Sequence, residues 1–286
     1  MPHPDFQPLS RTSAHPAHPV PAHPVLANAG PWTPLPWADV PRYDARSVAT
    51  HWARLHAGHA LPMPPDNSAL AEGWALYHSG EFERAATLGL LHGAEGLALA
   101  NQSSAIYADY LEPREAVRLA MFRQVIERAG AQAAAEPDNC QALYWQAYAL
   151  GRYSQGISVA RALAQGLGST LKGALERVIE LQPRHADAHL ALASFHAEVI
   201  DKVGALVGRM TYGVRAETSI ALFERGLEMH PDSAAGMMEY ARALLMLHGE
   251  SRMGEATRLY EQAAALKPAD ARERFDVELA RAGLKD

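Results

Sequence analysis

Three histidines recur at helical spacing in the segment HADAHLALASFHAEVID. Neutral imidazoles are good ligands for transition metals, and His185 and His189, four residues apart, share one face of a helix. His196, with the carboxylates that follow it, adds further ligand types. The segment lacks the His-Glu-x-x-His pattern of zinc hydrolases. We therefore interpret these as surface histidines that cap helices and form hydrogen bonds between them, and keep a metal site at His185, His189 and His196 as the weaker alternative.

Sequence patterns that carry catalysis are missing elsewhere. The segment GLGSTLKGA, residues 166–174, lacks the Gly-Lys-Ser/Thr ending with which a phosphate-binding loop holds phosphate and magnesium. No Gly-x-Ser-x-Gly elbow occurs. The single cysteine, Cys140, follows Pro137 at an expected helix start, where we interpret it as a packing residue. We predict a protein without enzymatic activity or cofactor; an unrecognised active site would need titratable groups of shifted pKa in a closed pocket.

Composition narrows the classes of partner. The 286 residues are 48% hydrophobic and 20% charged, which is enough apolar surface for a sizeable core. The formal net charge of -6 gives no electrostatic reason to bind phosphate backbones, so we do not expect nucleic acid as a partner. One cysteine can form neither an intrachain disulfide nor a cysteine-rich zinc site, as is typical of a reducing compartment.

The chain also shows no signal for a membrane or for secretion. Its first residues, MPHPDFQPLSRTSAHPAHPV, lack the basic and apolar regions of a signal peptide. No run of about 18 uninterrupted apolar residues occurs, so we expect no membrane span. From these features we predict a cytoplasmic protein.

The prolines mark where helices cannot run, because proline lacks a backbone N–H and fixes φ. Most of the 19 prolines lie at or before Pro41. Residues 1–43 are rich in proline and histidine and poor in contiguous apolar residues, so we predict a disordered tail. Residues 44–284 are interrupted only rarely by proline, and we predict that they form one helical domain.

The last four prolines each end the same pattern. An amphipathic run precedes each of them, and small or polar residues that open the next helix follow. Repetition at a period of roughly 20 to 50 residues is typical of a helical solenoid. Small and bulky residues recur before three of these prolines: Ala263, Tyr260 and Ala256 before Pro268; Gly226, Phe223 and Ser219 before Pro231; and, more loosely, Val178, Leu175 and Leu171 before Pro183.

These residues resemble the tetratricopeptide repeat (TPR), in which small residues let two helices approach and large ones fill the space between units. The segment ALAEGWALYHSGEFERAATLGLL is similar, with Gly73, Gly80, Phe82 and Ala85 at TPR-like spacing. The resemblance implies an all-α, TPR-like superhelical solenoid of antiparallel helix pairs. The final helix mixes charged and apolar residues as a solenoid cap should, which is consistent with a monomer.

The central part carries a narrower resemblance. In overall plan, residues 140–266 look like the helical domain of the regulator of microtubule dynamics protein family, and more distantly like the T component of tripartite periplasmic transporters. The transporter component is a lipoprotein, and no cysteine near the start of this sequence is available for lipidation. Neither family's specific activity is therefore carried over to this chain.

The TPR resemblance also implies a place for binding, since the first helix of each pair lines the concave surface. Projecting that pattern predicts a groove for a peptide or helix, and hence a protein-interaction scaffold or adaptor. Tyr144, Tyr148 and Leu190 have an alternative interpretation as core residues that pack between helices. The predicted groove residues are Gln141, Tyr144, Tyr148, Arg152, Asp187, Leu190, Ser194, Glu198, Met238, Arg242 and Leu245.

Two segments are longer than a regular repeat allows, at residues 151–173 and 197–216. Lengthened connections in repeat proteins often supply binding surface. We expect residues 204–213, GALVGRMTYG, to fold over one rim of the groove and narrow it into a pocket. The alternative function is therefore a carrier of a small molecule or metal ion, which would use the histidine-rich helix 185–201 together with these insertions.

Overall fold

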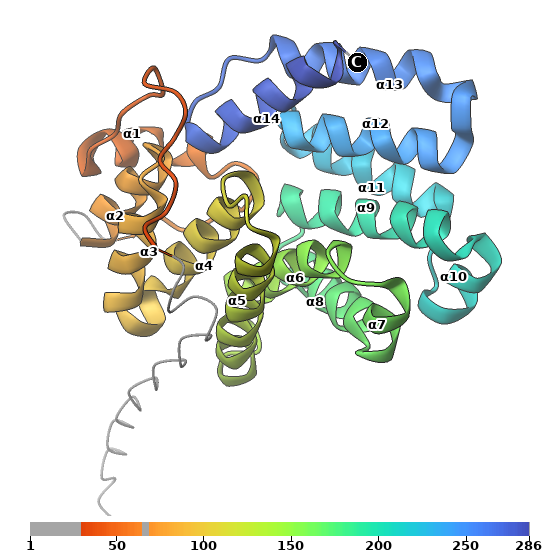
Figure 1. Cartoon of the computed structure of the whole chain (residues 1–286), viewed down its shortest axis with the longest axis horizontal. Coiled ribbons are helices and arrows are strands. Elements are labelled where there is room, and N and C mark those ends of the chain that lie inside the picture. The colour runs from red at the N-terminus through yellow and green to blue at the C-terminus, as the bar shows by residue number, and fades with distance from the viewer. Residues whose placement is uncertain (1–29, 65–68, 286) are drawn as a thin grey trace, which may run out of the picture.

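The computed structural model describes residues 30–64 and 69–285, and this part of the chain is built from helices without any β-strand (Figure 1). The helices are α1 (Ala45–Leu55), α2 (Ala69–His78), α3 (Phe82–Leu91), α4 (Gly93–Tyr110), α5 (Glu115–Ala135), α6 (Cys140–Gln155), α7 (Val159–Ala164), α8 (Leu167–Leu181), α9 (Ala186–Val203), α10 (Ala205–Tyr212), α11 (Ala216–Met229), α12 (Ala234–His248), the 3-10 turn η2 (Gly249–Arg252), α13 (Met253–Ala265) and α14 (Ala271–Gly283). Within these ranges, no helix is both long and apolar enough to cross a membrane.

Each of the four repeat prolines lies in a turn between two helices. In every case the second residue after the proline is the N-cap of the next helix, and its side chain accepts a hydrogen bond from a first-turn backbone N–H. A proline followed two residues later by a capping side chain therefore marks the end of one helix and the beginning of the next. The caps are Asn139 for α6, His185 for α9, Ser233 for α12 and Asp270 for α14.

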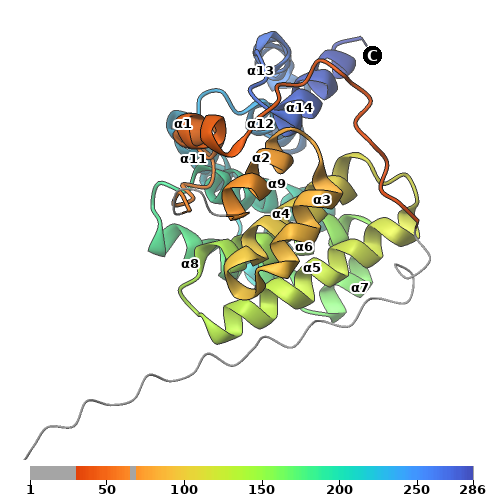
Figure 2. The same ribbon diagram turned by 90° about the vertical axis from the view of Figure 1, so that its left-hand side faces the viewer.

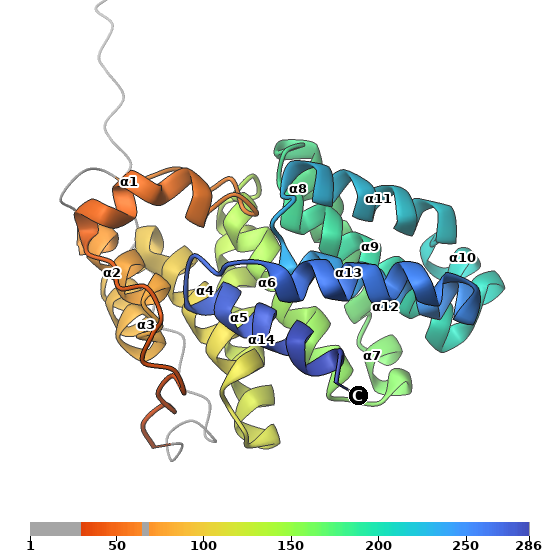
Figure 3. The same ribbon diagram turned by 90° about the horizontal axis from the view of Figure 1, so that it is seen from above.

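The helices form consecutive antiparallel pairs, which confirms the predicted TPR-like solenoid. The pairs are α2 with α3, α4 with α5, α6 with α8, α9 with α11, and α12 with α13. The first helix of each pair contacts the first helix of the next pair, so that these helices make an inner layer and their partners an outer layer (Figures 1 and 3).

Small residues allow the close approach within pairs, as the repeat pattern predicts. A Cβ on Gly226 would lie only 2.6 Å from Cδ2 of Leu190, so α11 packs against α9 at this glycine. Phe223 is fully buried and stacks on Tyr240 at a centroid distance of 5.0 Å. Ala263 is likewise buried between helices. The buried TPR positions thus join neighbouring units into one core.

The inner layer closes on itself, because α14 reaches back to contact α2. Arg54 of α1 donates from Nη2 to Oε2 of Glu273 at 2.9 Å. Nδ1 of His78 and Oδ2 of Asp270 are 2.6 Å apart and buried. The last helix therefore packs on α12 and α13 and also contacts the first helices, and Figure 1 shows α14 between α1 and α12.

Residues 30–43 pack against this closed layer, although we predicted that residues 1–43 would be disordered. The ring of Trp32 stacks on Tyr107 at 4.1 Å, Trp37 meets Phe275 edge-on at 4.8 Å, and Val40 is buried. Figure 2 shows this segment as an extended trace preceding α1. A few isolated apolar residues among the prolines are enough to order this segment, because they pack against the surface of the helices. Residues 1–29 of the predicted tail lie outside the described part of the chain.

Candidate functional site

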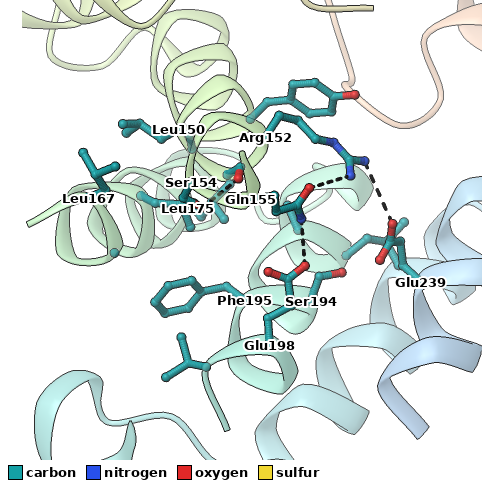
Figure 4. A pocket seen from close by; sticks show the side chains of 18 of the residues that line it. Leu150, Arg152, Ser154, Gln155, Leu167, Leu175, Ser194, Phe195, Glu198 and Glu239 are labelled. Carbon is teal, nitrogen blue, oxygen red and sulfur yellow. Dashed lines mark hydrogen bonds and ion pairs between the residues drawn. The ribbon is translucent and has the colours of Figure 1, made fainter. Parts of the chain in front are cut away.

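A cavity of about 210 Å³ opens on the inner layer between α6, α8, α9 and α12. The short helices α7 and α10 border it, and α14 contributes Arg272. Figure 4 shows its side chains from close by, with apolar groups such as Leu150, Leu167 and Phe195 on one side and Arg152 and Glu239 on the other. The cavity thus has an apolar part and a polar part.

The two insertions enclose the apolar part. Tyr212, the last residue of α10, lines the pocket, and its ring lies about 3.0 Å from where a Cβ on Gly168 would be. Gly168 belongs to the first turn of α8, so this glycine lets the two insertions touch. The other apolar residues of this part are Leu150, Leu167, Leu171, Leu175, Phe195, Val199 and Val203.

A band of polar side chains crosses the other part and connects three helices. Gln155 of α6 donates to Glu198 of α9 at 2.9 Å, and Arg152 donates to Gln155 at 3.4 Å (Figure 4). The Arg152 guanidinium also lies 3.9 Å from Glu239 of α12. From α4, Asp109 holds this band in place, because its carboxylate accepts from the Tyr148 hydroxyl at 2.6 Å and pairs with Arg152 at 3.0 Å.

Asp187, at the start of α9, and Arg272, at the start of α14, form the floor of the polar part. Nη1 of Arg272 donates to Oδ2 of Asp187 at 3.5 Å and to Nε2 of His59 at 3.2 Å. Burial lowers the pKa of His59 to about 3, so this imidazole is neutral and accepts the hydrogen bond. Tyr144 lies beside this floor, is 2% exposed, and has no hydrogen-bond partner for its hydroxyl among the described residues.

Arg152 and Asp187 keep their charges inside the pocket. Burial alone would lower the pKa of Arg152, but the carboxylates of Asp109 and Glu239 raise it well above its ordinary value. Burial would raise the pKa of Asp187, but the neighbouring His230 and the Arg272 guanidinium hold it well below the ordinary range. Both groups are therefore ionised at neutral pH.

A smaller cavity of about 40 Å³ lies behind Asp187 and Arg272, inside the closed inner layer. The hydroxyl of Tyr77 and Oε1 of Gln102 line it without a protein partner. Burial raises the pKa of Asp276 to about 7, although Arg272 and the Tyr110 hydroxyl oppose the rise. A cluster with shifted pKa values is thus present, so the absence of enzymatic activity stays a prediction.

Most of the predicted groove residues on α6 and α9 come together in this pocket. They occupy equivalent places on the two helices because both helices begin at the same point of the repeat. Their role in binding is a prediction that the geometry leaves open. The predicted residues that line the pocket are Tyr144, Tyr148, Arg152, Asp187, Leu190, Ser194 and Glu198.

Four predicted residues lie outside the pocket. Met238 is buried with Val277 of α14, because the closing helix covers that face of α12. Arg242 pairs with Glu239 at 3.0 Å, and Leu245 is half-buried farther along α12. Gln141 donates to the carbonyl of His59 at 3.5 Å, beneath the turn that follows α1. The repeat pattern cannot predict that Met238 is covered, since it contains no information on the position of α14.

The three histidines of the weaker metal alternative have separate hydrogen-bond partners. His185 is the N-cap of α9, His189 contacts the carbonyl of His185 at 3.0 Å, and Nδ1 of His196 lies 3.3 Å from the carbonyl of Arg215. In the described ranges, no three His, Cys, Asp or Glu side chains gather as a metal site. The capping interpretation of His185 is confirmed, but the expectation of surface histidines is wrong, because all three are buried by the neighbouring helices.

Several residues that shape the pocket could not be predicted from the sequence. Arg272 belongs to α14 and reaches the site through the closed inner layer, whereas Asp109 belongs to α4 of the preceding helix pair and reaches it because α4 packs on α6. Tyr212 falls within the insertion that we expected at the groove rim, so its segment, though not the residue, was predicted. Leu171 and Leu175 matched the repeat as packing residues, and they also face the cavity.

Comparison with known proteins supports the fold and nothing narrower. No protein-family model matches the chain, and no curated protein sequence matches it. The crystal structure of a thermophilic TPR protein of Thermus thermophilus is similar, with a TM-score of 0.52 and 18% sequence identity over 75% of this chain and 97% of that one. An identity this low shows a shared fold; the resemblances to the microtubule regulators and to the transporter component receive no support from it.

Proposed function

We propose that the protein is an interaction adaptor that binds a segment of a partner polypeptide in the pocket between α6, α8, α9 and α12. An apolar side chain of the segment would enter the part lined by Leu150, Leu171 and Phe195. The neighbouring peptide groups would meet the polar band and the floor. TPR-like solenoids present their inner layer to protein partners, so the fold supports this class of function at a general level.

One observation carries the proposal. The inner-layer residues predicted from the repeat on α6 and α9 surround a concave site that is apolar at one end and hydrogen-bonding at the other. A peptide segment has the same division, with an apolar side chain beside a polar backbone. Concave, mostly apolar pockets with a few placed polar groups are the usual form of a binding site.

A second candidate is a carrier of a small amphiphilic molecule. It is favoured by the enclosure of the pocket, because the contact between Gly168 and Tyr212 and the position of α14 close sides that stay open in a simple groove. A carrier would retain a small molecule through purification, which native mass spectrometry detects as a defined added mass.

The adaptor function is tested by selecting peptides from a random display library against the purified full-length protein. The dissociation constants of the enriched peptides are then measured for the wild type, for Ser194→Trp and for Ala221→Trp. Ser194 lines the pocket, so the tryptophan fills it, and we expect binding to weaken by about tenfold or more.

Ala221 is the matched control, since it is exposed on the outer helix α11 and takes the same new side chain. Its variant should bind as the wild type does. Circular dichroism and thermal unfolding of both variants check that the fold is kept. Enriched peptides that bind Ser194→Trp as tightly as the wild type would contradict the proposed site.

A further inference from the structure

Every charged residue that lines the pocket already has a partner of opposite charge. Arg152 pairs with Asp109 and Glu239, and Lys202 lies 3.4 Å from Glu198. At the floor, Arg272 pairs with Asp187. A charged ligand group would have to enter this partly buried site without a free counter-charge, and burying an unpaired charge is expensive.

The polar groups that do lack partners are hydroxyls. Tyr144 is almost completely buried, and its hydroxyl has no partner among the described residues. Ser194, on the facing helix α9, is half-buried in the pocket lining, and its hydroxyl has none there either. A hydroxyl both donates and accepts, so this pair suits a group that offers a carbonyl oxygen and an N–H together.

Resting on the proposed adaptor function, we propose that the pocket recognises an uncharged amide joined to an apolar chain, and therefore an internal peptide segment rather than a charged chain end. The charge pairs of the lining exclude carboxylate and ammonium groups, and the Tyr144 and Ser194 hydroxyls bind the amide. The apolar part beneath Tyr212 takes the side chain.

Three small probes of nearly equal size distinguish an uncharged ligand from one with a carboxylate and from one with an ammonium group. N-acetyl-leucine amide is neutral, N-acetyl-leucine carries a carboxylate, and leucine amide carries an ammonium group. We titrate each into the full-length protein and follow binding by NMR chemical-shift changes. The neutral probe should bind at least about tenfold more tightly than either charged probe, because each charge would be buried unpaired.

The variant Tyr144→Phe tests the hydroxyl, since it keeps the buried ring. One hydrogen bond is lost, so the neutral probe should bind roughly threefold to tenfold more weakly. The control is Tyr240→Phe, because Tyr240 is also largely buried but stacks on Phe223 outside the pocket. Its affinity should equal that of the wild type.

The outcomes distinguish this inference from the function on which it rests. Equal or tighter binding of the carboxylate or ammonium probe would overturn the uncharged-ligand inference and leave peptide binding intact. Unchanged affinity of Tyr144→Phe would overturn the role of the hydroxyl. Failure of all three probes and of every selected peptide to bind would overturn the adaptor function itself.

Discussion

Single side chains in the pocket are held by residues that the repeat pattern does not mark. Asp109 accepts from Tyr148 and pairs with Arg152, and so fixes two predicted pocket residues from a different repeat. The positions of Tyr148 and Arg152 could be predicted, because they follow from their distance to the helix start. Their partner could not be predicted, because it depends on how α4 and α6 pack.

Asp276 gives a pH-dependent prediction at the same scale. Its pKa is raised to about 7 in the folded chain, mainly by burial, against about 4 when unfolded. Between these values the folded state holds a proton that the unfolded state has lost, so this group lowers stability as pH rises from 4 to 7. Asp276→Asn removes this pH-dependent contribution to the unfolding free energy, because asparagine does not titrate. The unfolding free energy of the variant, relative to wild type, should therefore rise by a few kcal/mol across this window.

Chemical denaturation at a series of pH values measures this difference. The buried histidines, such as His59, contribute to both proteins alike and cancel when the two curves are subtracted. The relative stability should level off above about pH 7.5, where both states have lost the proton. A difference that stays constant from pH 4 to 8 would show that Asp276 has an ordinary pKa.

The positions of the inserted helices could be predicted from the sequence, but which face of each helix points toward the pocket could not. The lengths of the two insertions mark them as departures from the repeat, and residues 204–213 contain α10, which borders the pocket. That Tyr212 faces inward while Leu206 and Met210 are 72% and 80% exposed depends on packing against α9. A ten-residue segment with glycine at both ends carries too little periodicity to fix this face.

The orientation of α10 predicts opposite effects for two of its residues. Tyr212→Ala should remove one wall of the pocket, lower the unfolding free energy by about 1–2 kcal/mol and weaken selected peptides about tenfold. Met210→Ala, on the exposed face of the same helix, should change neither quantity. Thermal unfolding and peptide titration of the two variants compare them directly. Equal binding by both variants would show that α10 does not contribute to the site.

For the whole molecule, the main departure from a simple solenoid is its closure. The proline spacing and the small residues predict repeated helix pairs, and the structure confirms them. Neither pattern predicts that α14 turns back to α2, or that residues 30–43 pack along this junction. Closure depends on buried pairs such as His78 with Asp270, whose members lie far apart in the sequence. It also explains why Met238 packs against α14, whereas the equivalent residues of α6 and α9, Tyr144 and Leu190, line the pocket.

Trp37 offers a test of this closure. Its ring meets Phe275 of α14 and lies under the guanidinium of Arg274, so Trp37→Ala should lower the unfolding free energy by about 1–3 kcal/mol. Hydrogen exchange of the α14 amides should also become faster. Thr33→Ala, an exposed change in the same segment, serves as the control and should alter neither. Unchanged α14 exchange in Trp37→Ala would mean that the segment does not secure the closing helix.

The central claim is that the enclosed site between α6 and α9 is where the protein binds its partner. A crystal structure of the full-length protein with the tightest selected peptide tests it most directly. The account predicts an apolar peptide side chain among Leu150, Leu171 and Phe195, and an internal peptide group at the Tyr144 and Ser194 hydroxyls. A peptide bound on the outer helices, or a charged chain end at Arg272, would contradict it.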